Sequence, residues 1–352
     1  MDQNELLQKI RSEFGEQSMF ILGKEEKLMD IKVRPSGSLL LDIALGGGYP
    51  QGRVLELNGR EKSGKTTLLN LLIAESQLLE PEKTCAIIDL EHSFNPEWAK
   101  KLGVDVDKLF ITQPDTYAEK IFEMIEFMLK SKKFSIIGLD SIAGLISKAE
   151  IEEENYENNS QVGGTSKLNA RAMRKIVNSG LLTDSGTSLV FINQLRDKIG
   201  GFSMYGPQTT TGGGRALKHA YSQVLEVSIG DYFSKGQGDK KKVLGQQIKV
   251  KVAKNKIAPP FRTATIDVYY ENGIDRVREL VLVAKEIGVL QGTSWLKFVN
   301  PSTGEIYSDE DGKEIKWNGT DKTCEALVQD IQENNGILYS LLEATVHETL
   351  RG

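Results

Sequence analysis

The residues best suited to chemistry lie in the run LELNGREKSGKTTLLNLL, where Gly59-x-x-x-x-Gly64-Lys65-Thr66 matches a phosphate-binding loop. Glycines permit backbone conformations that larger residues avoid, so backbone N–H groups can point at a phosphate. Lys65 would place its charge on the outer phosphates, and the Thr66 hydroxyl would bind Mg²⁺. Because the loop stands between an expected strand and an expected helix, the sequence predicts nucleotide binding.

Acidic residues follow two other apolar runs. Asp140 ends FSIIGLD, a position from which a carboxylate can hold Mg²⁺ through water. Asp140 could instead cap the N-terminus of a helix, but the presence of the phosphate loop favours a metal-binding role. Glu91 follows CAIIDL and could activate the water that attacks a γ-phosphate, although most glutamates at such places are simply solvated. Asp89 competes with Glu91, and spacing alone does not decide between them.

A long polar segment begins at the end of a third apolar run, SLVFINQ. The segment reads INQLRDKIGGFSMYGPQTTTGGGRALK and is rich in glycine, threonine and basic residues. Ordering so long a loop costs entropy, so inside a compact domain it is usually functional. Gln194 stands where the segment begins, and its amide could sense a γ-phosphate and pull on the segment. Capping a turn is the alternative for this side chain.

The elements that position these residues alternate between short apolar strands and helical segments. This alternation indicates an α/β fold, in which a mainly parallel sheet is flanked by helices. The run QIKVKVAKN alternates apolar residues with lysine, so one face of that strand should be solvated. The expected strands are residues 53–58, 84–90, 135–140, 188–194 and 247–253.

Different patterns occupy the two ends of the chain. Leu6, Leu7, Ile10 and Phe14 have helical spacing, and Gly15 follows as a stop. Beyond residue 273 we expect a small α+β region with a helix at about 277–287, strands near 295–298 and 314–317, and two helices from residue 322. The sequence therefore predicts an N-terminal arm (1–32), an ATPase core (33–274) and a C-terminal domain (275–352).

Composition limits the classes of partner. The 352 residues are 39% hydrophobic and 26% charged, with no apolar run of membrane-spanning length. The net charge is −5, so any contacts with DNA must be made by particular loops. Two cysteines far apart in the chain argue against a disulfide framework and fit the cytoplasm. The three histidines are scattered and form no metal-ligand pattern.

Taken together, these residues resemble the bacterial RecA-type recombinases over nearly the whole chain. The resemblance implies a DNA-dependent ATPase that forms helical filaments on single-stranded DNA and exchanges strands with a homologous duplex, in recombination, repair and the SOS response. A ring-forming ATPase such as a helicase is the alternative, and an inactive DNA-binding scaffold is a third. The matching stretches are SGSLLLDIALGGG, GREKSGKTT, IDLEHSFNPEWAKKLGVD, QPDT, LDSIAGL, KAEIE, ARAMRK, FINQLRDKIG, TTTGGGRALK and KNKIAPPF.

The same resemblance implies roles for the nucleotide site. It makes Glu91, rather than Asp89, the general base, and Gln194 the link between nucleotide and DNA. Lys254 and Lys256 would reach the γ-phosphate held by a neighbouring subunit, although two lysines at a strand end are more often just solvated. The N-terminal helix would dock on the next subunit. The implied ATP and Mg²⁺ ligands are Gly59, Arg60, Glu61, Lys62, Ser63, Gly64, Lys65, Thr66, Thr67, Trp98 (where a tyrosine is usual) and Asp140.

Two DNA-binding loops are implied as well, at about residues 152–164 and 195–215, for both single-stranded and double-stranded DNA. The first loop is acidic before Asn158, so that half should point away from the strand. A solvated helix face is the alternative for the basic residues that follow it. The implied DNA contacts are Val162, Gly163, Lys167, Arg174, Arg196, Lys198, Ile199, Gly200, Thr210, Thr211, Gly212 and Gly213.

Overall fold

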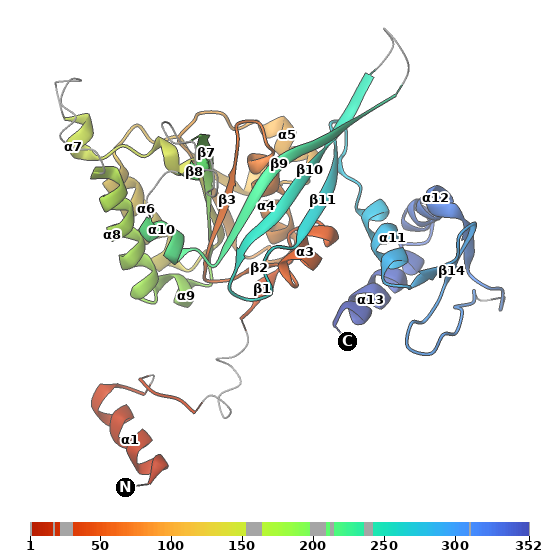
Figure 1. Ribbon diagram of the computed structural model, residues 1–352, viewed down its shortest axis with the longest axis horizontal. Helices are drawn as coiled ribbons and strands as arrows, with labels where there is room; N and C mark the ends of the chain where they lie inside the picture. The colour runs from red at the N-terminus through yellow and green to blue at the C-terminus, as the bar shows by residue number, and fades with distance from the viewer. Residues whose placement is uncertain are drawn as a thin grey trace, which may run out of the picture. The chain divides into compact units, whose positions relative to one another are not determined.

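The computed structural model (Figure 1) describes residues 2–16, 18–21, 31–152, 164–197, 209–211, 215–235, 242–309 and 311–351. The chain separates into two compact units, residues 1–33 and residues 34–352, and each is described by itself. None of the helices in these ranges has the length and apolar character needed to cross a membrane.

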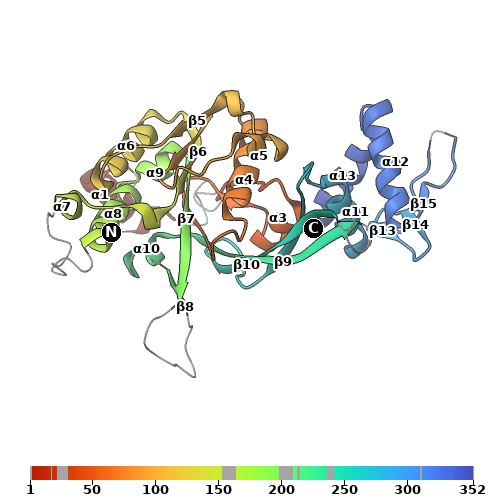
Figure 2. The same ribbon diagram turned by 90° about the horizontal axis from the view of Figure 1, so that it is seen from above.

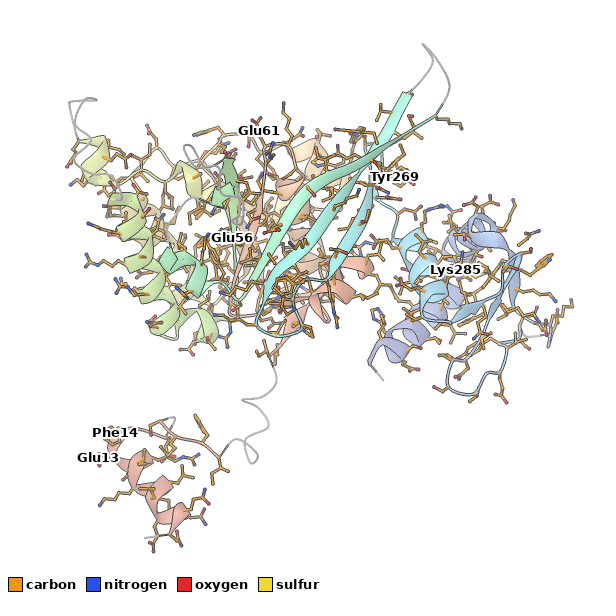
Figure 3. All side chains as sticks on the ribbon, viewed as in Figure 1. Glu13, Phe14, Glu56, Glu61, Tyr269 and Lys285 are labelled. Atoms are coloured by element: carbon orange, nitrogen blue, oxygen red, sulfur yellow. The ribbon has the colours of Figure 1, made fainter. Side chains whose placement is uncertain are left out.

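Among the described residues of the first unit, Gln3–Phe14 form helix α1. Asp2 begins it with a capping box that includes Glu5, and Gly15 ends it, as the spacing predicts. The helix buries none of its side chains, and Phe14, labelled in Figure 3, is 69% exposed. Its apolar stripe is therefore available for contact with another surface.

The second unit is built on a ten-stranded sheet whose main path runs β12-β11-β10-β9-β3-β7-β6-β4-β5, with β8 paired to β7. The strands from β9 to β5 along this path are mutually parallel, which confirms a mainly parallel core. Parallel strands end at one edge of a sheet, so the polar residues that follow them are brought together. These strands are β3 (Val54–Gly59), β4 (Thr84–Asp89), β5 (Leu109–Thr112), β6 (Phe134–Asp140), β7 (Ser188–Asp197) and β9 (Gln223–Lys235).

Helices cover both faces of the sheet. One apolar cluster packs α3, α4 and α5 against one face, and a second cluster packs α6, α8, α9 and α10 against the other. Figure 2 shows β7 and β8 running away from the rest of the sheet. The helices are α3 (Leu39–Leu45), α4 (Lys65–Leu79), α5 (Pro96–Lys101), α6 (Ala118–Ser131), α7 (Lys148–Ile151), α8 (Gly164–Asn178), α9 (Leu181–Ser185) and α10 (Arg215–Ala220). The short strands are β1 (Val33–Arg34), β2 (Tyr49–Pro50) and β8 (Thr209–Thr211).

The other side of the sheet is antiparallel and larger than the sequence predicts. The expected strand at 247–253 is the middle of β10 (Lys242–Asn255), and β11 (Thr263–Tyr269) and β12 (Gly273–Ile274) follow it. On β10, Lys249 and Lys251 are exposed, which confirms a solvated face. The prediction missed β9 and β11 because strands with a wet face carry polar residues and form no continuous apolar run. It missed β5 because that edge strand has only four residues.

The C-terminal region is a small α+β unit with its own apolar cluster, on which residues of α3 pack. Its expected helices and strands are all present, with bounds shifted by a few residues. They are α11 (Arg276–Glu286), β13 (Leu290–Gln291), β14 (Trp295–Phe298), β15 (Lys316–Asn318), α12 (Gly319–Glu333) and α13 (Ile337–Arg351).

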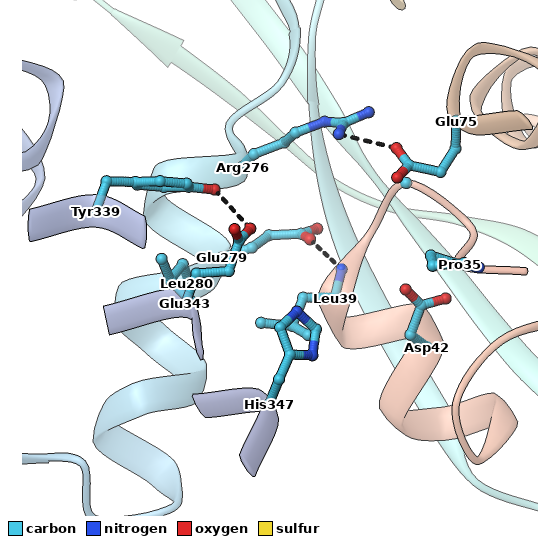
Figure 4. Close-up of a pocket in the computed structure, with 11 residues that line it drawn as sticks. Pro35, Leu39, Asp42, Glu75, Arg276, Glu279, Leu280, Tyr339, Glu343 and His347 are labelled. Carbon is cyan, nitrogen blue, oxygen red and sulfur yellow. Dashed lines mark hydrogen bonds and ion pairs between the residues drawn. The ribbon is translucent and has the colours of Figure 1, made fainter. Parts of the chain in front are cut away.

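A buried carboxylate joins this region to the core (Figure 4). Glu279 of α11 caps the start of α3, where it accepts hydrogen bonds from the Ser38 hydroxyl and the Leu39 N–H, both at 2.9 Å. A cavity of about 130 Å³ beside it is also lined by Asp42 and Glu75. Burial raises the pKa of both Glu279 and Asp42 to about 7, although hydrogen bonds to each oppose the change. Both acids are thus held more readily as neutral carboxyls than in water.

Replacing Asp42 with asparagine should make the stability of the contact between the C-terminal region and the core less dependent on pH. The folded-state pKa of Asp42, about 7, exceeds its ordinary value of 3.8, so folding takes up a proton between these values. The stability that comes from this proton uptake is present in full below pH 4 and is lost as the pH rises through 7. Asp42→Asn keeps an oxygen for the Ser36 N–H, 2.7 Å away in the native chain. It should raise the free energy of unfolding at pH 8 by about 2 kcal/mol.

Thermal unfolding measured from pH 5 to pH 8.5 tests this expectation. The wild-type midpoint should fall with rising pH more steeply than that of Asp42→Asn. Asp107→Asn, at an exposed acid of the core, is the control and should follow the wild type. Parallel profiles for the wild type and Asp42→Asn would contradict the assignment.

Candidate nucleotide and DNA site

The phosphate loop joins the end of β3 to the start of α4. Gly64 begins α4 with a φ of 97°, a conformation that L-residues with side chains rarely adopt. A Cβ atom there would lie 2.5 Å from Cδ1 of Ile248, and one on Gly59 would clash with the carbonyl of Val227. Glycine is therefore required at position 59 by the nearby backbone and at position 64 by the left-handed conformation. Arg60, Glu61 and Lys62 between them are exposed, and Glu61 is labelled in Figure 3.

Lys65 is 7% exposed and turns back over its own loop. Its Nζ donates to the carbonyl of Arg60 at 2.7 Å and to the carbonyl of Gly59 at 3.2 Å. Burial lowers the pKa of Lys65, while the charges of Asp140 and Glu91 oppose this. Neutral carbonyls hold the ammonium of Lys65. A negatively charged phosphate oxygen would bind it more strongly.

Thr66 and Asp140 meet at the start of α4. The Thr66 hydroxyl donates to Oδ2 of Asp140 at 2.8 Å. Burial raises the pKa of Asp140 to about 6, and the hydrogen bond from Thr66 opposes this. A hydroxyl and a buried carboxylate beside a phosphate loop fit Mg²⁺, which takes few protein ligands and keeps its waters. Among the described residues, no group of three or more acidic, histidine or cysteine side chains could hold a metal by itself.

The structure separates the two acids that spacing left open. Asp89 is 1% exposed, and its carboxylate accepts hydrogen bonds from Gln113 Nε2 at 2.9 Å and from the N–H of Phe94 at 3.0 Å. Burial favours its neutral form, but these bonds outweigh burial and hold the pKa of Asp89 below its usual value. Asp89 is therefore occupied in shaping its loop, whereas Glu91 is exposed at the carboxyl edge of the sheet.

Glu91 is tied to the ends of two other strands. Its Oε1 accepts a hydrogen bond from the Ser141 hydroxyl at 2.7 Å and another from Gln194 Nε2 at 2.9 Å. Ser141 follows β6, and Gln194 lies in β7 just before the long polar segment. The carboxylate suited to activating water is thus in direct contact with the side chain at the base of that segment.

Trp98 lies near the nucleotide loop from the side of α5. Asn95 caps that helix by accepting from the Trp98 N–H at 3.0 Å. The indole Nε1 donates to the Thr67 hydroxyl at 3.2 Å, and the ring of Tyr270 meets the indole edge-on, with centroids 6.5 Å apart. One partly exposed aromatic ring is therefore held next to α4.

The predicted DNA-contacting residues are described only in part. Lys167 and Arg174 are exposed on α8. Being seven positions apart, they share one face of that helix. Arg196 lies in β7 opposite Thr210 of β8, and Thr211 pairs with Leu195. The other predicted contacts lie outside the described residues: Val162, Gly163, Lys198, Ile199, Gly200, Gly212 and Gly213.

The lysine pair at the end of β10, Lys254 and Lys256, contacts helix α10, which follows the polar segment. Lys254 Nζ donates to the carbonyl of Lys218 at 2.5 Å, and Lys256 Nζ donates to the carbonyl of His219 at 3.1 Å. Cations at the carboxyl end of a helix are stabilised by its dipole. Burial lowers the pKa of Lys254, and the charge of Lys256 adds to this. These lysines are thus positioned by the helix and are more constrained than free surface side chains.

Sequence reasoning missed a polar cluster inside the sheet. Glu56 and Asn58 of β3 and Asn193 of β7 are at most 4% exposed and are hydrogen-bonded together. The available signal was the pair of polar residues, Glu56 and Asn58, in the buried strand VLELNG. The contact of Ser141 with Glu91 was missed as well, because it spans 50 positions.

Comparison with known proteins bears on the whole chain. Residues 2–275 match the family model described as the RecA N-terminal domain. The Protein RecA of Bacillus subtilis is 39% identical over 351 residues, covering 97% of this chain and 95% of that protein. The Protein RecA of Ruminococcus albus is 41% identical over 298 residues, covering 84% of this chain and 71% of that protein. With this match and the phosphate loop and strand-end residues in place, the chain belongs to the RecA family.

Proposed function

We propose that this chain binds ATP with Mg²⁺ at residues 59–67 and forms helical filaments on single-stranded DNA, which it pairs with a homologous duplex. As a RecA-family recombinase it is a DNA-dependent ATPase of homologous recombination and repair. The observation that carries the mechanism is the Glu91 carboxylate, which accepts a hydrogen bond from Gln194 at 2.9 Å. Through this contact, a change at the reacting phosphate would reach the base of the DNA-binding segment.

Each side chain of the site then has a part in hydrolysis. Lys65 leaves its loop carbonyls to neutralise the outer phosphates, and backbone N–H groups at the start of α4 bind the inner ones. Mg²⁺, when bound, would supply charge neutralisation, held by Thr66 directly and by Asp140 through water. Glu91 accepts the proton of the attacking water, and Trp98 stacks on the adenine. Gln194 exchanges its bond to Glu91 for one to the γ-phosphate, which displaces the start of the polar segment.

Filament formation completes this site between subunits. We assign residues 1–32 as an oligomerisation arm, 33–274 as the ATPase core and 275–352 as a C-terminal domain. The exposed apolar stripe of α1 supports the arm, since a head-to-tail contact that does not close produces a filament. Lys254 and Lys256 would then approach the γ-phosphate held by the neighbour. A ring-forming ATPase, the alternative, is not favoured, because the relatives that match over most of the chain are each named Protein RecA.

Glu91→Gln should abolish hydrolysis and leave nucleotide binding intact. The amide oxygen can still accept from Ser141 and Gln194, but it cannot take a proton from water. We expect kcat to fall by about 10²–10⁴-fold, the usual contribution of a general base, with little change in nucleotide affinity. ATP turnover with and without single-stranded DNA measures this. Glu97→Gln, at an exposed acid paired with Lys100, is the control and should behave as the wild type.

The same variant tests the assembly. With ATP and single-stranded DNA, electron microscopy should show persistent helical filaments, because the hydrolysis that releases DNA is blocked. Closed rings would contradict the recombinase assignment, and near-normal turnover would contradict the role of Glu91.

Asp140→Asn should remove the Mg²⁺-dependent part of nucleotide binding. We expect a loss of about 10–100-fold in the presence of Mg²⁺, as for other residues that hold a metal through an outer contact. Affinity measured in EDTA should be unchanged. Since the pKa of Asp140 is about 6, the wild type should bind more weakly below pH 6, where the carboxyl is protonated, and recover above it. The variant should lack this pH dependence, and retention of it would exclude Asp140 as its source.

Lys167 and Arg174 should each contribute one phosphate contact. Replacing either with alanine should lower the slope of log affinity against log salt by about 0.7 for single-stranded DNA. Lys175→Ala on the same helix is the matched control, because Lys175 is already paired with Glu126 at 2.7 Å. An equal effect of all three substitutions would mean that α8 is only a solvated basic face.

A further inference from the structure

Glu56 is a buried carboxylate that the hydrolysis mechanism leaves without a part. It lies in the middle of β3, is 2% exposed and is labelled within the core in Figure 3. Leu55 and Leu57 on either side pack towards α4, so alternation along the strand turns Glu56 to the opposite face. Burial raises the pKa of Glu56, and hydrogen bonds from Asn193 and Asn58 oppose this. Burying such a group is costly, so its surroundings indicate what it does.

The first contact of Glu56 leads to Gln194. Oε1 of Glu56 accepts from Asn193 Nδ2 at 2.8 Å, and Oδ1 of Asn193 accepts from the backbone N–H of Gln194 at 2.9 Å. Asn193 is fully buried, so its amide is clamped between the two. In the pairing of β3 with β7, Gly59 stands opposite Gln194. The clamp therefore holds Gln194 in register with the start of the phosphate loop.

A second relation leads to the lysine pair. The charge of Glu56 favours the ammonium form of Lys254, against the burial that lowers the pKa of Lys254. The charge of Lys218 in turn favours the carboxylate of Glu56. Lys254 donates to the carbonyl of Lys218 in α10, the helix at the far end of the polar segment. In the sheet, Glu56 of β3 stands opposite Val224 of β9, and Val224 in turn stands opposite Lys254 of β10. Glu56 is thus linked to Gln194 by hydrogen bonds through Asn193 and to Lys254 by its place across the sheet.

We propose that Glu56 is a positioning residue that keeps Gln194 and Lys254 in a common register, so that both ends of the DNA-binding segment respond together to the nucleotide. The inference rests on the role proposed for Gln194. Glu56 touches neither nucleotide nor DNA in this scheme and acts only through Asn193 and through its charge. A purely structural acid would instead affect folding alone.

Glu56→Gln tests this by removing the charge while keeping the shape. We expect the DNA-independent ATPase rate and the KM for ATP to stay near wild type. The DNA-stimulated kcat should fall by about ten-fold, within the range of coupling measured between groups of one network. Glu126→Gln, at a buried acid of α6 paired with Lys175, is the matched control and should keep normal stimulation.

The pair Glu56→Gln with Asn193→Asp provides a rescue. It exchanges amide and carboxylate, so one hydrogen bond and one negative charge are restored inside the sheet. DNA stimulation should recover to within about three-fold of wild type. Asn58→Ala, which removes only the 3.3 Å contact to Oε2, gives a milder variant should Glu56→Gln fail to fold, and it should reduce stimulation in the same direction.

Three outcomes would overturn the proposal. One is unchanged DNA stimulation in Glu56→Gln, or in Asn58→Ala where that variant replaces it. Another is a proportional loss of basal and stimulated rates, which would indicate a folding role. The third is failure of the exchanged pair to recover. Gln194→Ala distinguishes failure of the proposed function from failure of this inference. If Gln194→Ala keeps DNA stimulation, the role of Gln194 and this inference both fail. If Gln194→Ala loses stimulation while Glu56→Gln keeps it, only this inference fails.

Discussion

A single carboxylate oxygen, Oε1 of Glu91, accepts hydrogen bonds from the ends of two different strands, through Ser141 and Gln194. The arrangement is possible because β4, β6 and β7 are parallel, so their carboxyl ends lie at one edge. A hydrogen bond depends steeply on distance and angle, and a carboxylate that turns towards water must weaken one of these contacts. In the proposed mechanism, a change at Glu91 would therefore be felt at the start of the polar segment. The phosphate loop, the sheet and the helices behind it keep this contact in place.

Local patterns were sufficient for the phosphate loop and for the parallel strands β3, β4, β6 and β7, because these are defined by neighbours in sequence. They could not choose between Asp89 and Glu91, which stand two positions apart at the end of the same strand. The choice depends on Gln113, 24 positions away, which occupies the carboxylate of Asp89. The resemblance to RecA-type proteins supplied Glu91, and the hydrogen bonds give the physical reason why Asp89 is less free to act. The contact of Ser141 with Glu91, 50 positions apart, has no local signature for the same reason.

The antiparallel side of the sheet shows a different limit. On β9 and β10 one face is wet for much of the length, so apolar residues alternate with charged ones and only the centre of β10 stood out. The joint with the C-terminal region depends on Glu279, which caps a helix 240 positions earlier in the chain. Neither the partner nor the burial of that carboxylate has a sequence signature. The resulting pKa near 7 arises only when the two surfaces meet.

The polar cluster in the centre of the sheet bears on what this architecture is built for. Glu56, Asn58 and Asn193 occupy positions where leucine or valine would pack at no desolvation cost, and replacing buried polar groups with apolar ones is often stabilising. A gain in stability therefore does not explain them. Their hydrogen bonds are directional, so they define one register between β3 and β7, whereas apolar side chains tolerate small shifts. Since Gly59 and Gln194 stand opposite each other at the end of these two strands, a fixed register here holds the phosphate loop and the base of the polar segment together at one edge of the sheet.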